Sequence, residues 1–227
     1  MLNWLGSYAA SSIGKKVTMA LSGLALVGFL IAHLTGNLLL YKADEGRAFE
    51  LYAQKLHDLG PLLLVAEFGL IALFGTHIFL AARTTLENRR ARTSRYAVAT
   101  NHGERNLASS SMPITGLVIL LFLILHLLDF RFDSTFKDKF LHGEEALEGV
   151  GAANIVWAEL AGPVEALLYL VGVIALTIHL IHAIPSALQT LGVNHPHLNP
   201  WLRKLGMGLA VVLGLGFASL PVAALIR

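Results

Sequence analysis

Five long runs of apolar residues, separated by polar and charged segments, dominate the pattern of this chain. They cover residues 17–41, 61–82, 112–128, 161–188 and 205–226, and the third run extends into 129–132. Each is close to the roughly 20 helical residues that cross about 30 Å of hydrocarbon. None alternates apolar and polar residues with the period of two that a barrel strand needs. The pattern predicts an all-α membrane protein with five transmembrane helices in one integral-membrane domain, residues 1–227.

A shorter pattern lies between the first two runs. Phe49, Tyr52, Leu56 and Leu59 repeat at helical spacing, and charged residues occupy the other faces. This arrangement is typical of a short helix that lies in the membrane interface.

Composition narrows the chemistry that the chain can perform. It is 55% hydrophobic and 14% charged, whereas a soluble domain is about 25% charged. The expected surroundings are therefore a lipid bilayer, and no nucleic-acid partner is expected. The absence of cysteine excludes disulfides, thiolate metal sites, iron–sulfur ligation and covalently attached haem. Histidine remains as the metal-ligating residue, and the chain has ten.

Charge is distributed unequally between the two sides of the predicted bundle. The N-terminus, the segment 83–111 and the turn 189–204 carry ten Lys and Arg residues but only two acidic residues, Glu87 and Glu104. The opposite side and its helix ends carry the other seven basic and thirteen acidic residues. The excess of Lys and Arg marks the cytoplasmic side. We expect a multi-pass protein of a bacterial cytoplasmic membrane with its N-terminus inside and its C-terminus outside.

Four histidines lie within four of the apolar runs: His33, His77, His126 and His179. An ionisable side chain inside a membrane is costly and usually marks a function. The predicted helix directions and a rise of about 1.5 Å per residue put His33 and His126 in the outer half. They put His77 and His179 in the inner half. The sequence thus supplies two histidines at each of two depths.

A pair of histidines on facing helices can bind the two axial positions of one haem iron. The four residues therefore predict a bundle that encloses two haems b. The alternative is a set of separate histidines that contact neighbouring helices or line a proton route. His182 follows His179 by three residues and lies on roughly the same helix face, so both cannot occupy one axial position. His182 would then donate a hydrogen bond in support of the ligand or contact a neighbouring helix.

Three stretches of the sequence carry a resemblance to a known family. They are AHLTGNLL at 32–39, LHDLGPL at 56–62 followed by Glu67 and THI at 76–78, and HLIH at 179–182 followed by SALQTLG at 186–192. The chain resembles the diheme cytochrome b anchor of succinate dehydrogenases and fumarate reductases with a single five-helix membrane subunit. The similarity extends over nearly the whole chain.

The resemblance implies specific ligand pairs: His33 with His126 for the outer haem, and His77 with His179 for the inner one. It favours His179 over His182, because the family ligand begins an H-x-x-[H/N]-G-x-x-S pattern. Ala183 replaces the glycine of that pattern here, and Pro185 occupies one of its variable positions. Family members often have Ala-Ser-Arg-Thr-Met where this chain has ASSSM at 108–112. A cation that would hold a haem propionate is thus missing, and Arg83 or a lysine near the start is the expected substitute.

The resemblance also implies a function in electron transfer. The chain would carry electrons between a quinone, usually menaquinone in such anchors, and an iron–sulfur subunit joined to a flavoprotein. Those cytoplasmic subunits would interconvert succinate and fumarate, and the anchor itself would not act on succinate. The segment 83–111, with six arginines, is the expected docking face, although lipid headgroups would also attract it. Whether the complex forms a higher oligomer is left open by the sequence.

Quinone chemistry needs a group that exchanges protons with the ring. Glu67, early in the second run and near the outer surface, is the best acidic candidate, and its alternative is a carboxylate that bonds a neighbouring helix. If Glu67 is not used, the surroundings of the inner haem near Ser109 and Gln189 are the next candidates. Two other functions stay open, namely the haem b anchor of a hydrogenase or formate dehydrogenase and a non-redox membrane transporter.

Overall fold

The fold is helical throughout the part of the chain that the structure describes. The computed structural model describes residues 11–90, 107–132 and 151–227, with side chains from residue 111 onward in the second range. Within these ranges there are seven α-helices, one 3-10 turn and no strand. The all-α prediction is therefore confirmed.

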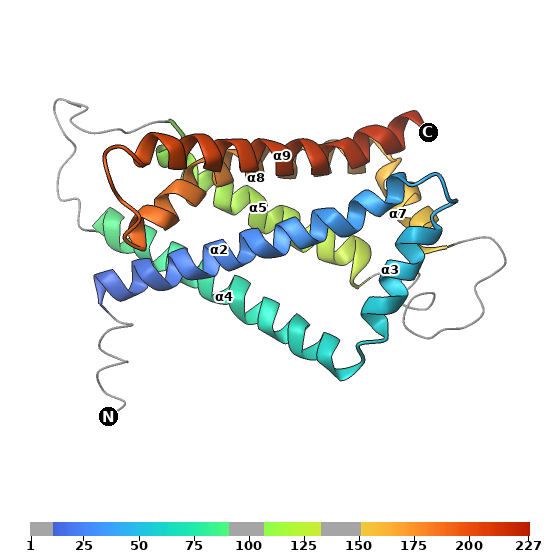
Figure 1. The fold of residues 1–227 in the computed structure, drawn as a ribbon, viewed down its shortest axis with the longest axis horizontal. Coiled ribbons are helices and arrows are strands. Elements are labelled where there is room, and N and C mark those ends of the chain that lie inside the picture. Colours follow the sequence, from blue (N-terminus) through green and yellow to red (C-terminus); the bar gives the residue numbers. More distant parts are fainter. Residues whose placement is uncertain (1–10, 91–106, 133–150) are drawn as a thin grey trace.

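Five of the helices are long and apolar enough to cross a membrane. They are α2 (Ser12–Asn37, continued by the 3-10 turn Leu38–Tyr41), α4 (Pro61–Arg90), α5 (Leu107–Phe130), α8 (Pro163–Thr190) and α9 (Asn199–Ile226). Each long helix runs opposite to the preceding one (Figure 1). The prediction of a multi-pass membrane protein with five spans is confirmed.

The helices extend further into polar sequence than the apolar runs do. α4 ends at Arg90, eight residues beyond the predicted limit of 82, and α9 begins at Asn199, six residues before 205. Hydropathy marks only the part of a helix that hydrocarbon can cover. Polar residues with good helix propensity continue the backbone hydrogen bonds into water, and Lys and Arg extend their charged ends away from the hydrocarbon.

The predicted short helix between the first two spans is present as α3, Arg47–His57. Gly46 precedes it with φ of +87°, a left-handed conformation that glycine adopts without strain. α3 buries Phe49 and Ala53, whereas Leu59 lies beyond its end. The helix is thus confirmed, but the apolar face is shorter than predicted.

A further short helix, α7 (Ala152–Leu160), was not predicted. Its nine residues are too few to show a periodic pattern clearly. α7 packs against α3, α8 and α9 at one end of the bundle, and Ala161 and Gly162 separate it from α8. Trp157 of α7 lies beside Tyr41 and beneath the guanidinium of Arg227. We call this end of the bundle the α3/α7 end.

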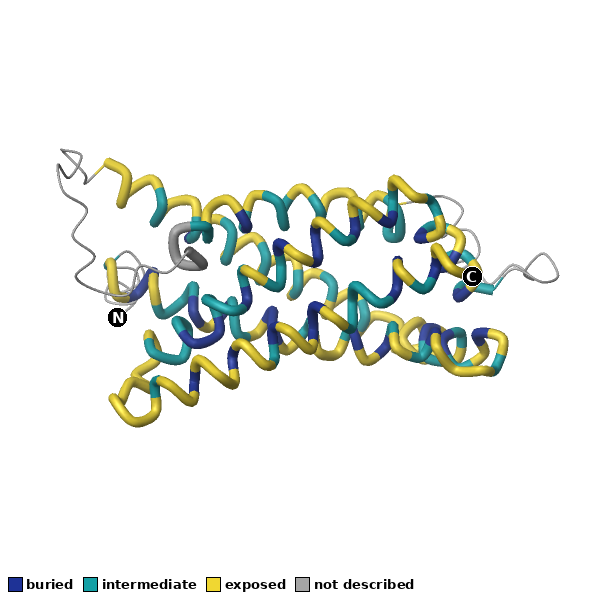
Figure 2. Tube along the Cα trace, turned by 90° about the horizontal axis from the view of Figure 1, so that it is seen from above, coloured by how far each residue is buried: buried dark blue, intermediate teal, exposed yellow. Residues whose placement is uncertain are grey.

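α8 is the most central of the long helices. It packs along α9, α5 and α2, and α4 packs mainly against α2. Leu80 is the one buried residue of α4. Figure 2 shows the exposed residues along the outer sides of the helices and the buried ones between them. Such an apolar outer surface is suited to lipid, because lipid tails, unlike water, solvate it without cost.

Two groups of buried apolar residues hold the helices together. One lies at the α3/α7 end and joins α3 and α7 to α8 and α9, and the other joins α2, α8 and α9. The members of the second are Val27, Leu34, Leu180, Ile184, Ala210 and Leu213.

Gly172→Ala is expected to destabilise the protein because α5 and α8 approach closely at this glycine. A Cβ atom on Gly172 would overlap the ring of Phe122. Overpacking of this kind costs about 1–3 kcal/mol, which outweighs the roughly 1 kcal/mol that replacing a helical glycine contributes. Thermal unfolding in detergent should show a lower Tm.

The matched control is Gly208→Ala in α9, where a Cβ atom would meet nothing within 4 Å. This variant should be as stable as the original protein or more so. Equal Tm values for the two variants would contradict the close α5–α8 contact.

Candidate functional site

His33 and His126 face each other across the bundle. His33 is on α2 and His126 on α5, and their ring centroids are 5.8 Å apart with an interplanar angle of 84°. The rings are surrounded by aromatic side chains. Phe29 and Phe217 lie 5.4 and 5.8 Å from His33, and Phe122 and Phe130 lie 5.9 and 5.3 Å from His126.

His77 of α4 and His179 of α8 form the second pair. Each contacts one of the two helices that carry the first pair: His77 contacts α2, and His179 contacts α5. Each ring also contacts a hydroxyl group of a neighbouring helix. Nδ1 of His77 is 3.3 Å from Ser22 Oγ of α2, and Nδ1 of His179 is 3.1 Å from Thr115 Oγ1 of α5.

These hydroxyl contacts favour the tautomer in which Nδ1 of His77 and of His179 carries the proton. Ser22 Oγ donates its hydrogen to the carbonyl of Met19, and Thr115 Oγ1 donates to the carbonyls of Ser111 and Met112. A hydroxyl has one hydrogen to give and two lone pairs to accept with. A hydroxyl that gives its hydrogen to a carbonyl can accept a hydrogen bond from Nδ1–H, and His77 also forms a hydrogen bond with the backbone of Met19. In the tautomer with Nδ1–H, Nε2 carries the lone pair, which is the form that ligates a metal.

Nδ1 of His126 also contacts a hydroxyl group of a neighbouring helix. Its Nδ1 is 3.4 Å from the hydroxyl of Tyr169 on α8, and that hydroxyl donates at 2.8 Å to Oδ2 of Asp129. The hydroxyl can again accept from Nδ1–H, and in that tautomer Nε2 of His126 carries the lone pair. Among the described residues, no hydrogen bond to the His33 ring is found, and its neighbours are the aromatic rings described above.

Two glycines give the rings of the second pair their space. A Cβ atom on Gly23, beside Ser22, would lie 3.2 Å from Cε1 of His77, tighter than an ordinary contact. A Cβ atom on Gly116, beside Thr115, would lie 3.8 Å from Cε1 of His179. Each histidine thus packs against a hydroxyl–glycine pair on a partner helix.

The sequence contains a repeat that marks these positions. SGLALVGFLIAH at 22–33 and TGLVILLFLILH at 115–126 share the initial hydroxyl–glycine pair, the phenylalanine and the final histidine. Ten residues, about 15 Å of helix, separate each glycine from its histidine. α2 and α5 therefore each contact one histidine of the second pair and supply one of the first. Ser22, Thr115, Tyr169 and Asp129 were missed in the sequence analysis, and this repeat would have revealed the first two.

The spacing of the first histidine pair fits a bis-histidine haem. Two imidazoles that share one iron, each with a metal–nitrogen bond of about 2 Å, have ring centroids roughly 6 Å apart. The 5.8 Å between His33 and His126 matches this spacing. No group of three or more His, Asp or Glu side chains in the described segments is arranged to hold a bare metal ion. A haem iron needs only two ligands from the protein, since the porphyrin supplies four.

A cavity of about 180 Å³ opens beside His33, between α2 and α3. Asn37, Tyr52 and Leu56 contribute to its lining. Tyr52 lies against the α2 backbone at Gly36, where any larger residue would overlap its ring. At the level of His33, the bundle is therefore open on the side that faces α3.

Glu67 lies at the α3/α7 end of α4, at the level of the first histidine pair. Its carboxylate accepts a hydrogen bond of 3.0 Å from Nη2 of Arg131, which follows α5. Both side chains are about one-third exposed, at 34% and 40%. The carboxylate predicted from sequence is therefore bonded to the neighbouring helix end and still reaches the surface.

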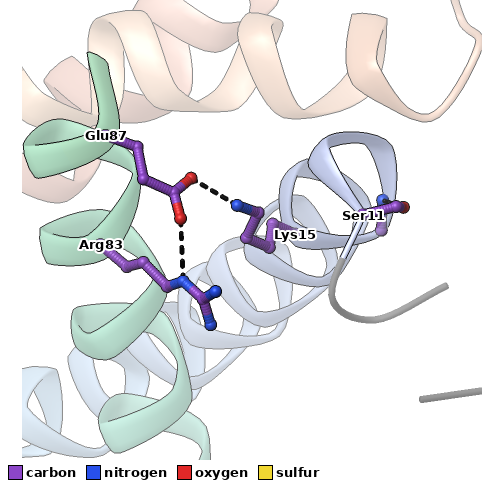
Figure 3. Close-up of polar contacts among 5 residues, drawn as sticks. Ser11, Lys15, Arg83 and Glu87 are labelled. Carbon is purple, nitrogen blue, oxygen red and sulfur yellow. Dashed lines mark hydrogen bonds and ion pairs between the residues drawn. The ribbon is translucent and has the colours of Figure 1, made fainter. Parts of the chain in front are cut away.

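Arg83 belongs to a charged cluster at the opposite end of the bundle (Figure 3). Glu87 accepts a hydrogen bond of 2.9 Å from Nε of Arg83 and a contact from Nζ of Lys15, so it bridges α4 and α2. Lys15 is buried. This arrangement joins the two helix ends and brings two cations to the side where the N-terminus of α2 lies.

The remaining predicted residues are placed as follows. Gln189 is in the last turn of α8, and Ser109 is in the first turn of α5 without a described side chain. His182 is half-buried, one turn beyond His179. The arginines at 92, 95 and 105, together with His102 and His142, lie outside the described residues.

No protein-family model matches the chain, and the comparisons with curated proteins and with solved structures find no match either.

Proposed function

We propose that this protein is the membrane-anchor cytochrome b subunit of a succinate dehydrogenase or fumarate reductase complex. It would pass electrons through two haems b between an iron–sulfur subunit and a quinone, with menaquinone the expected type. The observation that carries the proposal is the arrangement of four histidines at two levels: the rings of His33 and His126 face each other, and His77 and His179 contact the two helices that carry that pair.

The histidine tautomers support ligation at both levels. The Nδ1–H groups of His77, His179 and His126 are engaged by hydroxyls, so each Nε2 is free to bind iron. A ring held at Nδ1 cannot rotate freely, and this fixes the direction of the ligating atom. His33 would be oriented by packing, since Phe29 stacks on it with an interplanar angle of 18°.

Haem iron gains and loses single electrons, and two haems about 15 Å apart along the helices would connect the two ends of the bundle. The protein's part is to bury the ligands and keep water from them. His33 and His126 lie within a shell of phenylalanines, which is suited to a low-dielectric site.

The partner subunits would dock on the positively charged side. Arg83, Arg89 and Arg90 at the end of α4 and Lys15 at the start of α2 lie at one end of the bundle, and the positive-inside rule assigns that end to the cytoplasm. The flavoprotein and iron–sulfur subunits would perform the succinate chemistry there.

Quinone would react near the first histidine pair, where Glu67 would exchange its protons. The Glu67 carboxylate is partly exposed and held by Arg131, so it is both accessible and fixed in position. A general acid or base must be within hydrogen-bond reach of the group that it serves.

Two haems b per chain are expected in the purified protein, because two histidine pairs are present. Pyridine haemochrome analysis should give a ratio near two. His33→Ala or His126→Ala should remove the haem of the first histidine pair and leave the other haem bound. His77→Ala or His179→Ala should remove the haem of the second pair and leave the first. A wild-type ratio of zero would favour the transporter alternative, and co-purified subunits would distinguish a succinate complex from a hydrogenase or formate dehydrogenase.

His179, and not His182, is expected to ligate iron. Thr115 holds Nδ1 of His179, and no such hydroxyl contact to His182 is found among the described residues. His179→Ala should therefore abolish one low-spin signal in the electron paramagnetic resonance spectrum. His182→Asn should keep both signals, and loss of a signal in this variant alone would reverse the assignment.

Glu67→Gln is expected to slow reaction with a quinol at least tenfold while both haems stay bound and spectrally normal. The substitution keeps the shape of the side chain and removes its proton exchange. Arg131→Gln is the control, because it breaks the same ion pair and leaves the carboxylate intact. If both variants lose turnover equally, the ion pair has a structural role and Glu67 is not the proton-exchanging group.

A further inference from the structure

The His126 side chain is the start of a hydrogen-bonded chain that ends on a carboxylate. His126 Nδ1 is 3.4 Å from the Tyr169 hydroxyl, which donates to Oδ2 of Asp129 at 2.8 Å. Asp129 lies three residues after His126 on α5, so both face α8. A carboxylate inside an apolar helix is costly, and its contact here is with the group that holds a histidine.

Packing fixes Tyr169 in this position. The side chain is 8% exposed, and its ring meets Phe122 edge-on at 5.1 Å and Phe130 at 6.2 Å. Three aromatic neighbours, counting His126 itself at 6.0 Å, leave the ring little freedom. The hydroxyl is thus directed at His126 and Asp129 together.

The first histidine pair differs from the second in the charge of the group to which its hydroxyl donates a hydrogen bond. The Ser22 and Thr115 hydroxyls donate to neutral backbone carbonyls, whereas the Tyr169 hydroxyl donates to an acidic side chain. A carboxylate polarises the hydroxyl more strongly than a carbonyl does, which makes the hydroxyl oxygen a better acceptor for Nδ1–H. His126 would consequently be the more basic ligand.

We propose that Tyr169 and Asp129 are positioning residues that fix the tautomer of His126 and lower the reduction potential of the haem at the His33–His126 level. This inference rests on the proposed function. A more basic imidazole and a nearby negative charge both stabilise the oxidised, more positive iron, so the two effects have the same sign.

The test is a redox titration of the purified protein with Tyr169→Phe, which keeps the ring packing and removes the hydroxyl. The ratio of reduced to oxidised haem at a fixed potential should rise about tenfold for this haem, which corresponds to about 59 mV for one electron. Asp129→Asn should shift the potential in the same direction. The low-spin ferric signal assigned to this haem should also change, and the other haem should keep its potential.

Ser22→Ala is the matched control, because it removes a neutral hydroxyl from the second pair. It should leave the potential of the haem at the His33–His126 level unchanged. Unchanged potentials in both Tyr169→Phe and Asp129→Asn would overturn the inference, and so would loss of the haem from both, because the residues would then only hold the site together. A wild-type protein without haem would instead refute the proposed function itself.

Discussion

The need to pair every polar group inside hydrocarbon governs this structure. A buried imidazole without a partner costs free energy, and water is not present to supply one. The chain meets this need for three of the four histidines with hydroxyl groups from neighbouring helices: Ser22 for His77, Thr115 for His179 and Tyr169 for His126. The His33 ring is packed among aromatic rings instead. Because these hydroxyls donate elsewhere, they can accept from Nδ1–H, and that tautomer leaves the lone pair on Nε2.

That constraint connects helix packing with the candidate site. Gly23 and Gly116 bring α2 and α5 close to the rings of His77 and His179, and Gly172 brings α8 close to Phe122 of α5. Small residues thus set the distances between helices, as is common in membrane bundles. α4 is the exception, with Leu80 as its one buried residue. Its position depends mainly on α2, through His77 and through the Glu87 contacts with Lys15.

The sequence was sufficient for the five long apolar helices, because these follow from hydropathy. It also predicted α3 from the spacing of Phe49 and Tyr52. It could not predict α7, whose nine residues show no clear period, or the partners of Glu67 and Arg83. Arg131 lies 64 residues from Glu67, and such contacts depend on how α4 and α5 pack. Haem ligation and the orientation of the termini stay predictions.

The repeat of SG and TG ten residues before His33 and His126 connects local sequence with the two-level arrangement. In each repeat one helix carries a histidine of one level and a hydroxyl–glycine pair that contacts a histidine of the other level. A change in the helical phase of α2 or α5 would therefore disturb both levels together. Of the three hydroxyls that contact a histidine, only that of Tyr169, at the first level, donates to a carboxylate, Asp129. Two sites built from similar helices can thus differ in their electrostatics through a single residue placed one helical turn beyond the histidine.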